Sequence, residues 1–351
     1  HRVGLDAAVT SLIPPAGPRA DPEAITTPTR AETGSISGTV IPPPGLQPAL
    51  SLFHENVDTA VVVLVGLESG QEVYTALVPP GTYRAYAWLP DFTLLGAHTA
   101  CDEEQPCTDH TPLPIPVAGG QDVVNVDITD WHVPESPVVA LSGRLIDGNG
   151  GEPVEDGVLV MWERHIMAVG SEAELTVPAH ARHHAMPGMS ILPGFINSHV
   201  HNAYLRRNLE RWARAGVTTV RDLGAPVDSP WDVLRDLFEN DSRYARILAA
   251  GPLVTCPDGY PIVPNGFPSL AVGSDEEARE EIDRLVDRGA DVIKIVIESG
   301  VEEVLSVELA TTIVDTAHAR GLPVTVHVNL QRDLITALDA GVDDVAHVVL
   351  D

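Results

Sequence analysis

Four glycines divide the second half of the chain into repeating units. In each unit a helix-like stretch ends at a glycine, and an apolar strand begins within a few residues. The strands are Thr218–Leu223 after Gly216, Val292–Ile297 after Gly289, Val324–Asn329 after Gly321 and Val345–Leu350 after Gly341. Glycine just past a helix end is a common stop signal because it adopts the left-handed conformation readily. Ser274 and Glu277 add a capping box at the start of the helix before Gly289. Repeated units of this kind predict an α/β fold with a parallel sheet covered by helices.

One of these strands holds the only lysine of the chain. Lys294 lies within the apolar run Val292–Ile297, whereas the other basic side chains of the 21 are arginines. Burying an unpaired ammonium is costly, so a lysine in a buried strand normally loses its charge or acquires a strong partner. An arginine-rich composition also explains one leftover lysine, so the neighbouring strands decide between the two interpretations.

Histidines occupy the matching positions of the neighbouring strands. Lys294 follows its glycine by five residues, and His327 and His347 follow theirs by six. The strand Ile191–Val200 adds His199 and, directly after it, His201; residues two apart on a strand face the same side. A single strand histidine is more often a hydrogen-bonded core residue, but the shared register favours ligands. Four imidazoles and a lysine converging from four strands predict a metal site.

Alternation along Val324–Asn329 places Asn329 on the same face as His327. We therefore expect Asn329 to be a substrate-binding residue. The segment Thr255–Pro268 follows the third strand and is a second candidate for the wall of the pocket.

The first 192 residues have a different composition and a different predicted secondary structure. Residues 1–33 are rich in Pro, Ala and Thr and predict a flexible leader or linker. Residues 34–132 consist of short β-rich runs separated by Pro and Gly, which predicts an all-β sandwich. The segment Val78–Trp88 resembles a hairpin of prealbumin-like or carboxypeptidase-regulatory-like modules, which are usually accessory. A second β-rich block with tight Asp-Gly and Gly-Gly turns occupies residues 138–192.

The motifs of the second half resemble those of the amidohydrolase superfamily. Pro193–His201 is similar to the opening strand of that family, and Leu141–Gly170 looks like its N-terminal strands. Residues 216–224, 289–294 and 341–347 are similar to the branch that contains imidazolonepropionase-like proteins and Xaa-Pro dipeptidases. The resemblance covers about residues 138–351. It implies a TIM-type (β/α)8 barrel over residues 193–351, with a binuclear metal site at the C-terminal ends of the strands and residues 138–192 as the N-terminal β-subdomain.

The resemblance also implies a role for each ligand. His199 and His201 would hold one divalent ion, most often zinc, and His327 and His347 the other. Lys294, carboxylated by CO2, would bridge the two ions as a carbamate, which only a neutral primary amine can form. The implied reaction is hydrolysis of an amide-type C–N bond by metal-activated hydroxide, in a non-peptide amide, a cyclic amide or a dipeptide.

Two features depart from the family pattern. Asn197 stands where the family often has aspartate. The chain also stops at Asp351, after the sixth predicted strand, so the proton-shuttle aspartate of strand eight is not in the chain. We therefore expect an incomplete barrel of about six strands, a C-terminally truncated fragment of a longer enzyme. Two alternatives stay open, a non-catalytic binding protein on a degenerate barrel and a mononuclear deaminase; Lys294 counts against the deaminase.

The composition of the chain limits the classes of binding partner that we expect. The formal net charge of −29 disfavours nucleic acid and anionic membranes, and no apolar run is long enough for a membrane span. A small-molecule amide or short peptide is the expected partner, and homo-oligomerisation stays open. Cys101 and Cys107 flank an acidic loop and favour a disulfide over two reduced thiols. A disulfide would indicate a secreted or periplasmic protein.

Overall fold

The computed structural model describes residues 33–45, 50–57, 62–101, 108–163, 165–175, 177–238, 241–300 and 303–350. The predicted leader except its last residue, Cys107 and Asp351 lie outside these ranges. The described residues form two compact units, one ending at Pro193 and the other beginning at Gly194. Among the described residues no helix is both long and apolar enough to cross a membrane. Each unit is described by itself.

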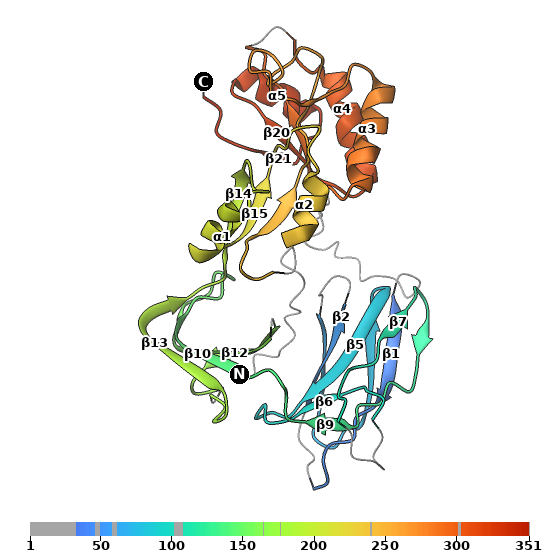
Figure 1. Cartoon of the computed structure of the whole chain (residues 1–351), viewed down its shortest axis with the longest axis vertical. Coiled ribbons are helices and arrows are strands. Elements are labelled where there is room, and N and C mark those ends of the chain that lie inside the picture. The colour runs from blue at the N-terminus through green and yellow to red at the C-terminus, as the bar shows by residue number, and fades with distance from the viewer. Residues whose placement is uncertain are drawn as a thin grey trace. The chain divides into compact units, whose positions relative to one another are not determined.

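The first unit begins with two β-sheets (Figure 1). Their strands are β1 (Gly34–Thr39), β2 (Leu50–Asn56), β3 (Val62–Leu67), β4 (Val73–Val78), β5 (Gly81–Trp88), β6 (Leu95–Ala97), β7 (Ile115–Val117), β8 (Asp122–Val123) and β9 (Asp130–His132). One sheet has the order β4-β1-β8, the other β3-β2-β5-β6-β9, with β7 paired to β5. Apolar side chains of both sheets, including Ile36, Leu52, Tyr74 and Tyr83, pack into one core. The assignment as a sandwich module stays a prediction.

A third sheet completes this unit. Its strands are β10 (Val138–Leu145), β11 (Val154–Trp162), β12 (His165–Ser171) and β13 (Arg182–Ile191), in the order β12-β11-β10-β13. Val138, Val158 and Trp162 of this sheet share a core with Phe53 and Trp88 of the preceding strands. β13 pairs parallel with β10, and the other two pairings are antiparallel.

The second unit alternates parallel strands with helices, as the glycine spacing predicts. Its strands are β14 (Phe195–Val200), β15 (Val217–Asp222), β16 (Arg246–Ala249), β17 (Val254–Thr255), β18 (Leu270–Ala271), β19 (Ile293–Val296), β20 (Val324–His327) and β21 (Asp344–Val345). Its helices are α1 (Arg206–Arg214), α2 (Trp231–Phe238), α3 (Asp275–Asp287), α4 (Val307–Ala319) and α5 (Gln331–Asp339). The sheet orders are β14-β15-β16 and β18-β17-β19-β20-β21, all with parallel pairings. The Asp291 amide donates to the Ala249 carbonyl oxygen at 2.8 Å and so links β16 to the start of β19. The α/β prediction is confirmed, and closure into a (β/α)8 barrel stays a prediction.

The glycine stops set the depth of the strands. Gly216, Gly289, Gly321 and Gly341 have φ angles of 83°, 84°, 77° and 88°, in the left-handed region that glycine tolerates best. At the other end of α3 the Ser274 hydroxyl accepts a hydrogen bond from the Glu277 amide at 3.3 Å, as the capping box predicts. Because each helix stops at an equivalent place, β19, β20 and β21 start and end at similar levels, and their C-terminal ends meet at one edge.

Candidate metal centre

The five predicted ligands all line one cavity of about 620 Å³ in the second unit. His199 lies on β14, Lys294 on β19 and His327 at the last position of β20, while His201 and His347 follow β14 and β21 closely. The remaining wall is largely apolar and includes Leu253, Val296, Tyr260, Pro261, Phe267 and Pro268. The loop after β17 therefore lines the cavity, as the sequence predicts.

His199 and His201 present one ring nitrogen each to the same point. Nδ1 of His199 lies 3.0 Å from the carbonyl oxygen of Ala346, and His201 forms a hydrogen bond with the backbone of Gly224. A carbonyl oxygen only accepts, so Nδ1 of His199 must be the donor, which leaves Nε2 of this neutral ring with a lone pair. The two Nε2 atoms are 3.3 Å apart. Burial lowers the pKa of both histidines, which favours the neutral rings that a metal requires.

His327 and His347 form the second pair. Nδ1 of His327 lies 2.7 Å from Nε2 of His347. The His327 ring is also stacked on Tyr260, with ring centroids 5.1 Å apart. Burial, followed by the neighbouring His347, lowers the pKa of His327 to about 3, so this ring is neutral near pH 7.

Lys294 is nearly inaccessible, with 2% of its surface exposed. Its Nζ has no hydrogen-bond partner among the described residues, and neither has the hydroxyl of Thr325, which pairs with Lys294 across β19 and β20. Burial lowers the pKa of Lys294 to about 7; the nearby Arg221 lowers it further, and Asp344 opposes the shift. A substantial fraction of Lys294 is therefore an uncharged amine near neutral pH.

Asp222, at the end of β15, organises the segments around His201. Its carboxylate accepts hydrogen bonds from the amides of Ala203 at 2.7 Å and Gly224 at 3.1 Å. Burial raises its pKa to about 6. Gly224 approaches His201 so closely that a Cβ there would lie 3.1 Å from the imidazole ring. The backbone after β15 thus fixes the ring that it contacts.

This donor set fits divalent transition metals. Ligand atoms of a tetrahedral zinc ion with bonds of 2.0–2.1 Å lie roughly 3.4 Å apart, close to the 3.3 Å between the two Nε2 atoms. Two facing lone pairs repel unless a proton or a cation lies between them. The buried, unpartnered Nζ of Lys294 adds a nitrogen in the same cavity.

Asn329 and Glu298 lie behind His327. The Asn329 side-chain amide donates to Oε2 of Glu298 at 2.7 Å, and Asn329 is not among the residues that line the cavity. A role for Asn329 in substrate binding stays a prediction. Glu298 belongs to none of the sequence motifs of the site. Strand parity offered the signal, because Lys294, Val296 and Glu298 alternate onto one face.

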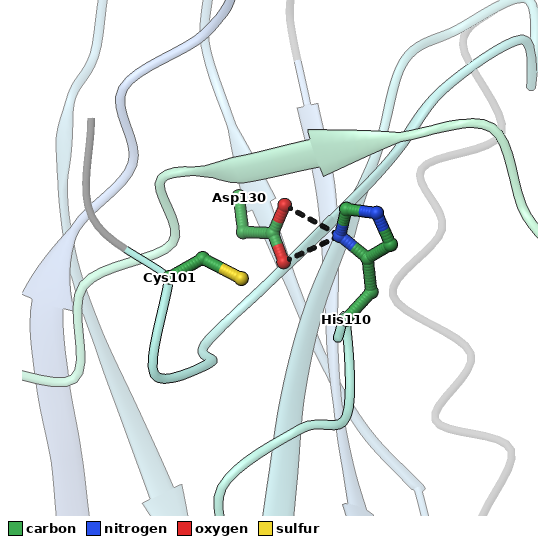
Figure 2. Close-up of side chains that lie close together, drawn as sticks. All are labelled: Cys101, His110 and Asp130. Carbon is green, nitrogen blue, oxygen red and sulfur yellow. Dashed lines mark hydrogen bonds and ion pairs between the residues drawn. The ribbon is translucent and has the colours of Figure 1, made fainter. Parts of the chain in front are cut away.

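A second group of potential metal ligands lies in the first unit, at β9 (Figure 2). Ligand atoms of Cys101, His110 and Asp130 lie within 4.8 Å of one another. Asp130 is buried, and its two carboxylate oxygens lie 2.9 and 3.0 Å from Nδ1 of His110. Cys101, however, is disulfide-bonded, so its sulfur is not a thiolate ligand. Its predicted partner, Cys107, lies outside the described residues.

His132 does not complete this group. Its Nδ1 lies 3.6 Å from Asp130, but its ring stacks on His110 with centroids 4.1 Å apart and planes inclined by 18°. An ion bound by an imidazole lies close to the ring plane, and two nearly parallel rings cannot both direct Nδ1 at one ion. The structure therefore favours a hydrogen-bonded His110–Asp130 pair that fixes the loop before β7 to β9.

The fold and the cavity define a class, an α/β unit with histidines and a lysine at the strand ends. Residues 190–350 match the sequence model of the Amidohydrolase family, and the match includes all five predicted ligands. No curated protein matches the chain. A solved structure of a candidate prolidase from Bifidobacterium longum is 30% identical, with a TM-score of 0.50 over 60% of this chain and 54% of that one. Aspergillus (A. niger) ochratoxinase is 21% identical, with a TM-score of 0.51 over 60% of each chain, and shows the fold alone. The chain thus spans little more than half the length of these structures.

Proposed function

We propose that the protein is a binuclear metal-dependent hydrolase that cleaves amide-type C–N bonds. The observation that carries the proposal is the pair of Nε2 atoms of His199 and His201, 3.3 Å apart, with Nδ1 of His199 held by the backbone. The amidohydrolase match over the same residues supports a hydrolase. His199 and His201 would hold one divalent ion, and His327 and His347 the second.

Lys294 has the properties that a bridging carbamate needs. Its neutral Nζ can attack CO2, forming an N–C bond while one C–O π pair moves to oxygen and a proton is released, and burial leaves a substantial fraction of the amine uncharged near pH 7. The carbamate would offer two oxygens as ligands to the ions that the histidines would hold. When bound, the two ions would polarise the substrate carbonyl and lower the pKa of water. The chain itself contributes the orientation of the four imidazoles and the apolar wall that limits access of bulk water.

Metal analysis tests the proposal directly. The purified full-length protein, incubated with zinc and bicarbonate, should hold two ions per chain by elemental analysis. Lys294→Arg should lose at least one ion, because guanidinium forms no carbamate. In Lys294→Ala, a short carboxylic acid should restore part of the metal and the activity by supplying the two oxygens.

Three outcomes distinguish the alternatives. Two ions retained in Lys294→Arg would contradict the carbamate bridge, and a single ion with deaminase activity would favour a mononuclear enzyme. Substrates for the assay are amides, cyclic amides and dipeptides with a C-terminal proline, the last because of the 30% identity to the candidate prolidase. Binding of these compounds without turnover in the metal-loaded full-length protein would favour a binding protein.

A further inference from the structure

We infer that Glu298 is a positioning residue that fixes the tautomer of His327, so that Nδ1 of His327 is the nitrogen presented to the metal centre. The inference deepens the proposed function, on which it rests for its metal. It starts from the observation that one ring nitrogen of each of two other ligands is already assigned by a backbone acceptor, while His327 has no such contact among the described residues.

The two nitrogens of His327 face different groups. Nδ1 faces Nε2 of His347 across 2.7 Å, on the side of the cavity. Nε2 faces away from His347, with Oε2 of Glu298 at 3.4 Å and Nδ2 of Asn329 also at 3.4 Å. These two neighbours favour opposite tautomers of His327, because a carboxylate oxygen accepts a hydrogen bond and an amide NH2 donates one.

The carboxylate of Glu298 has the stronger influence on the tautomer of His327. Asn329 donates to the same Oε2 of Glu298 at 2.7 Å, whereas its Nδ2 lies 3.4 Å from Nε2 of His327, so the ring receives at most a weak hydrogen bond from the second N–H of this amide. The reverse orientation of the Asn329 amide would set two oxygens against each other. A hydrogen bond to a charged acceptor is also stronger than one between neutral groups. Nε2 of His327 therefore carries the proton, which the carboxylate of Glu298 attracts across 3.4 Å, and Nδ1 keeps its lone pair.

Burial makes this arrangement effective. The side chains of His327 and Glu298 are 16% and 11% exposed, so water competes little for either group. Asn329 would then support Glu298, which is a different role from the substrate contact that its strand parity predicts. A carboxylate behind a ligating histidine holds the ring in place and raises its basicity.

Three variants and two measurements test the inference. Glu298→Met removes the acceptor at similar size, Glu298→Gln keeps a neutral oxygen acceptor, and Asp333→Asn is the matched control. Asp333 is a buried carboxylate nearby that accepts a hydrogen bond from the Ser299 amide at 3.0 Å. The first measurement is the ¹⁵N chemical shift of the His327 ring in metal-free full-length protein. The second is zinc affinity by competition with a chromogenic chelator.

We expect the Nε2–H tautomer in the wild-type protein and in Glu298→Gln, and a shift toward Nδ1–H in Glu298→Met. Zinc affinity should fall roughly 10- to 100-fold in Glu298→Met, the range for outer-sphere partners of metal ligands, and less in Glu298→Gln. An Nδ1–H tautomer in the wild type, unchanged affinity in Glu298→Met, or an equal loss in Asp333→Asn would overturn the inference. If the wild-type protein bound no zinc, the proposed function would fail, while the ¹⁵N measurement would still decide the role of Glu298.

Discussion

The strand-end histidines of the second unit and the His110–Asp130 pair of the first unit use the same side-chain chemistry in opposite ways. At β9 a buried carboxylate lies between its neighbours and binds the donor nitrogen of His110 with both oxygens. At the strand ends the nitrogens of four imidazoles meet one another instead, at 3.3 and 2.7 Å, and the carboxylate of Glu298 lies behind one ring. The first arrangement pairs a donor with an anionic acceptor, whereas the second places imidazole nitrogens against one another in two pairs that line one cavity.

A close group of ligand-type residues is therefore not by itself evidence of a metal site. The decisive question is whether each ligand atom already has a complementary hydrogen-bond partner. In the first unit Thr99, His110 and Asp130 form a closed set of hydrogen bonds, and Cys101 is oxidised. In the second unit the backbone holds Nδ1 of His199, the carboxylate of Glu298 lies beside Nε2 of His327, and the four rings line the cavity.

Removing one histidine from each group should give the largest contrast. Zinc sites bind with roughly 10–16 kcal/mol, so one of about four ligands is worth roughly 3–4 kcal/mol, or more than a hundredfold in affinity. His199→Ala should lower zinc content and affinity by that amount and abolish hydrolysis. His110→Ala should leave all three unchanged. Elemental analysis and chelator competition measure the difference, and equal losses in the two variants would remove the distinction between the groups.

The next contrast concerns pH and Lys294. The amine titrates near pH 7 in the fold and near 10.5 in the unfolded chain, so between these values the unfolded state binds more protons. Stability of the metal-free protein should therefore rise from pH 7 toward pH 10, by roughly 3 kcal/mol at about 1.4 kcal/mol per unit of pKa difference. Lys294→Met should lose this rise. Urea unfolding at pH 7.0, 8.5 and 9.5 measures it, and parallel pH profiles for wild type and variant would show that Lys294 is not buried as described.

A smaller effect is expected from the acidic residue of the closed pair. Asp130→Ala leaves the half-buried donors of Thr99 and His110 without their acceptor, which should lower the free energy of unfolding by about 1–3 kcal/mol. Zinc content should not change. The exposed Asp91, which accepts from Thr93, gives the control Asp91→Ala, expected within about 0.5 kcal/mol of wild type. Loss of zinc in Asp130→Ala would mean that the β9 group binds metal after all.

Much of the second unit follows from local sequence rules, and the site follows from the fold. The glycine stops and the Ser274 cap identify the helix ends, and strand parity brings His199, His201, Lys294, His327 and His347 to one edge. Such local rules do not predict contacts between segments that are far apart in the sequence. The contact between His199 and the Ala346 carbonyl spans 147 residues and depends on how β14 and β21 approach, which no local pattern records.

Other features that local sequence rules do not predict also depend on the pairing of distant strands. His183 and His184 lie on β13, which pairs parallel with the more distant segment β10. The role of Glu298 depends on the position of His327 on the next strand, so its parity with Lys294 gains meaning only once β19 and β20 are paired. The histidines and the lysine that line the cavity were predictable by type and spacing, and their hydrogen-bond partners were not.

The smallest expected effect concerns the wall of the cavity and tests whether packing alone explains it. Tyr260 stacks on His327 with ring planes inclined by 17°, and Tyr260→Phe keeps this ring while removing the hydroxyl. If the ring only packs, zinc affinity and kcat should each change by less than about threefold, and stability by no more than about 0.5 kcal/mol. Tyr260→Ala, which also removes the ring, should lower both zinc affinity and stability. A tenfold loss of kcat in Tyr260→Phe at unchanged zinc affinity would show that the hydroxyl contacts the substrate. The cavity of the second unit would then include a catalytic group that neither its spacing nor its hydrogen bonds indicated.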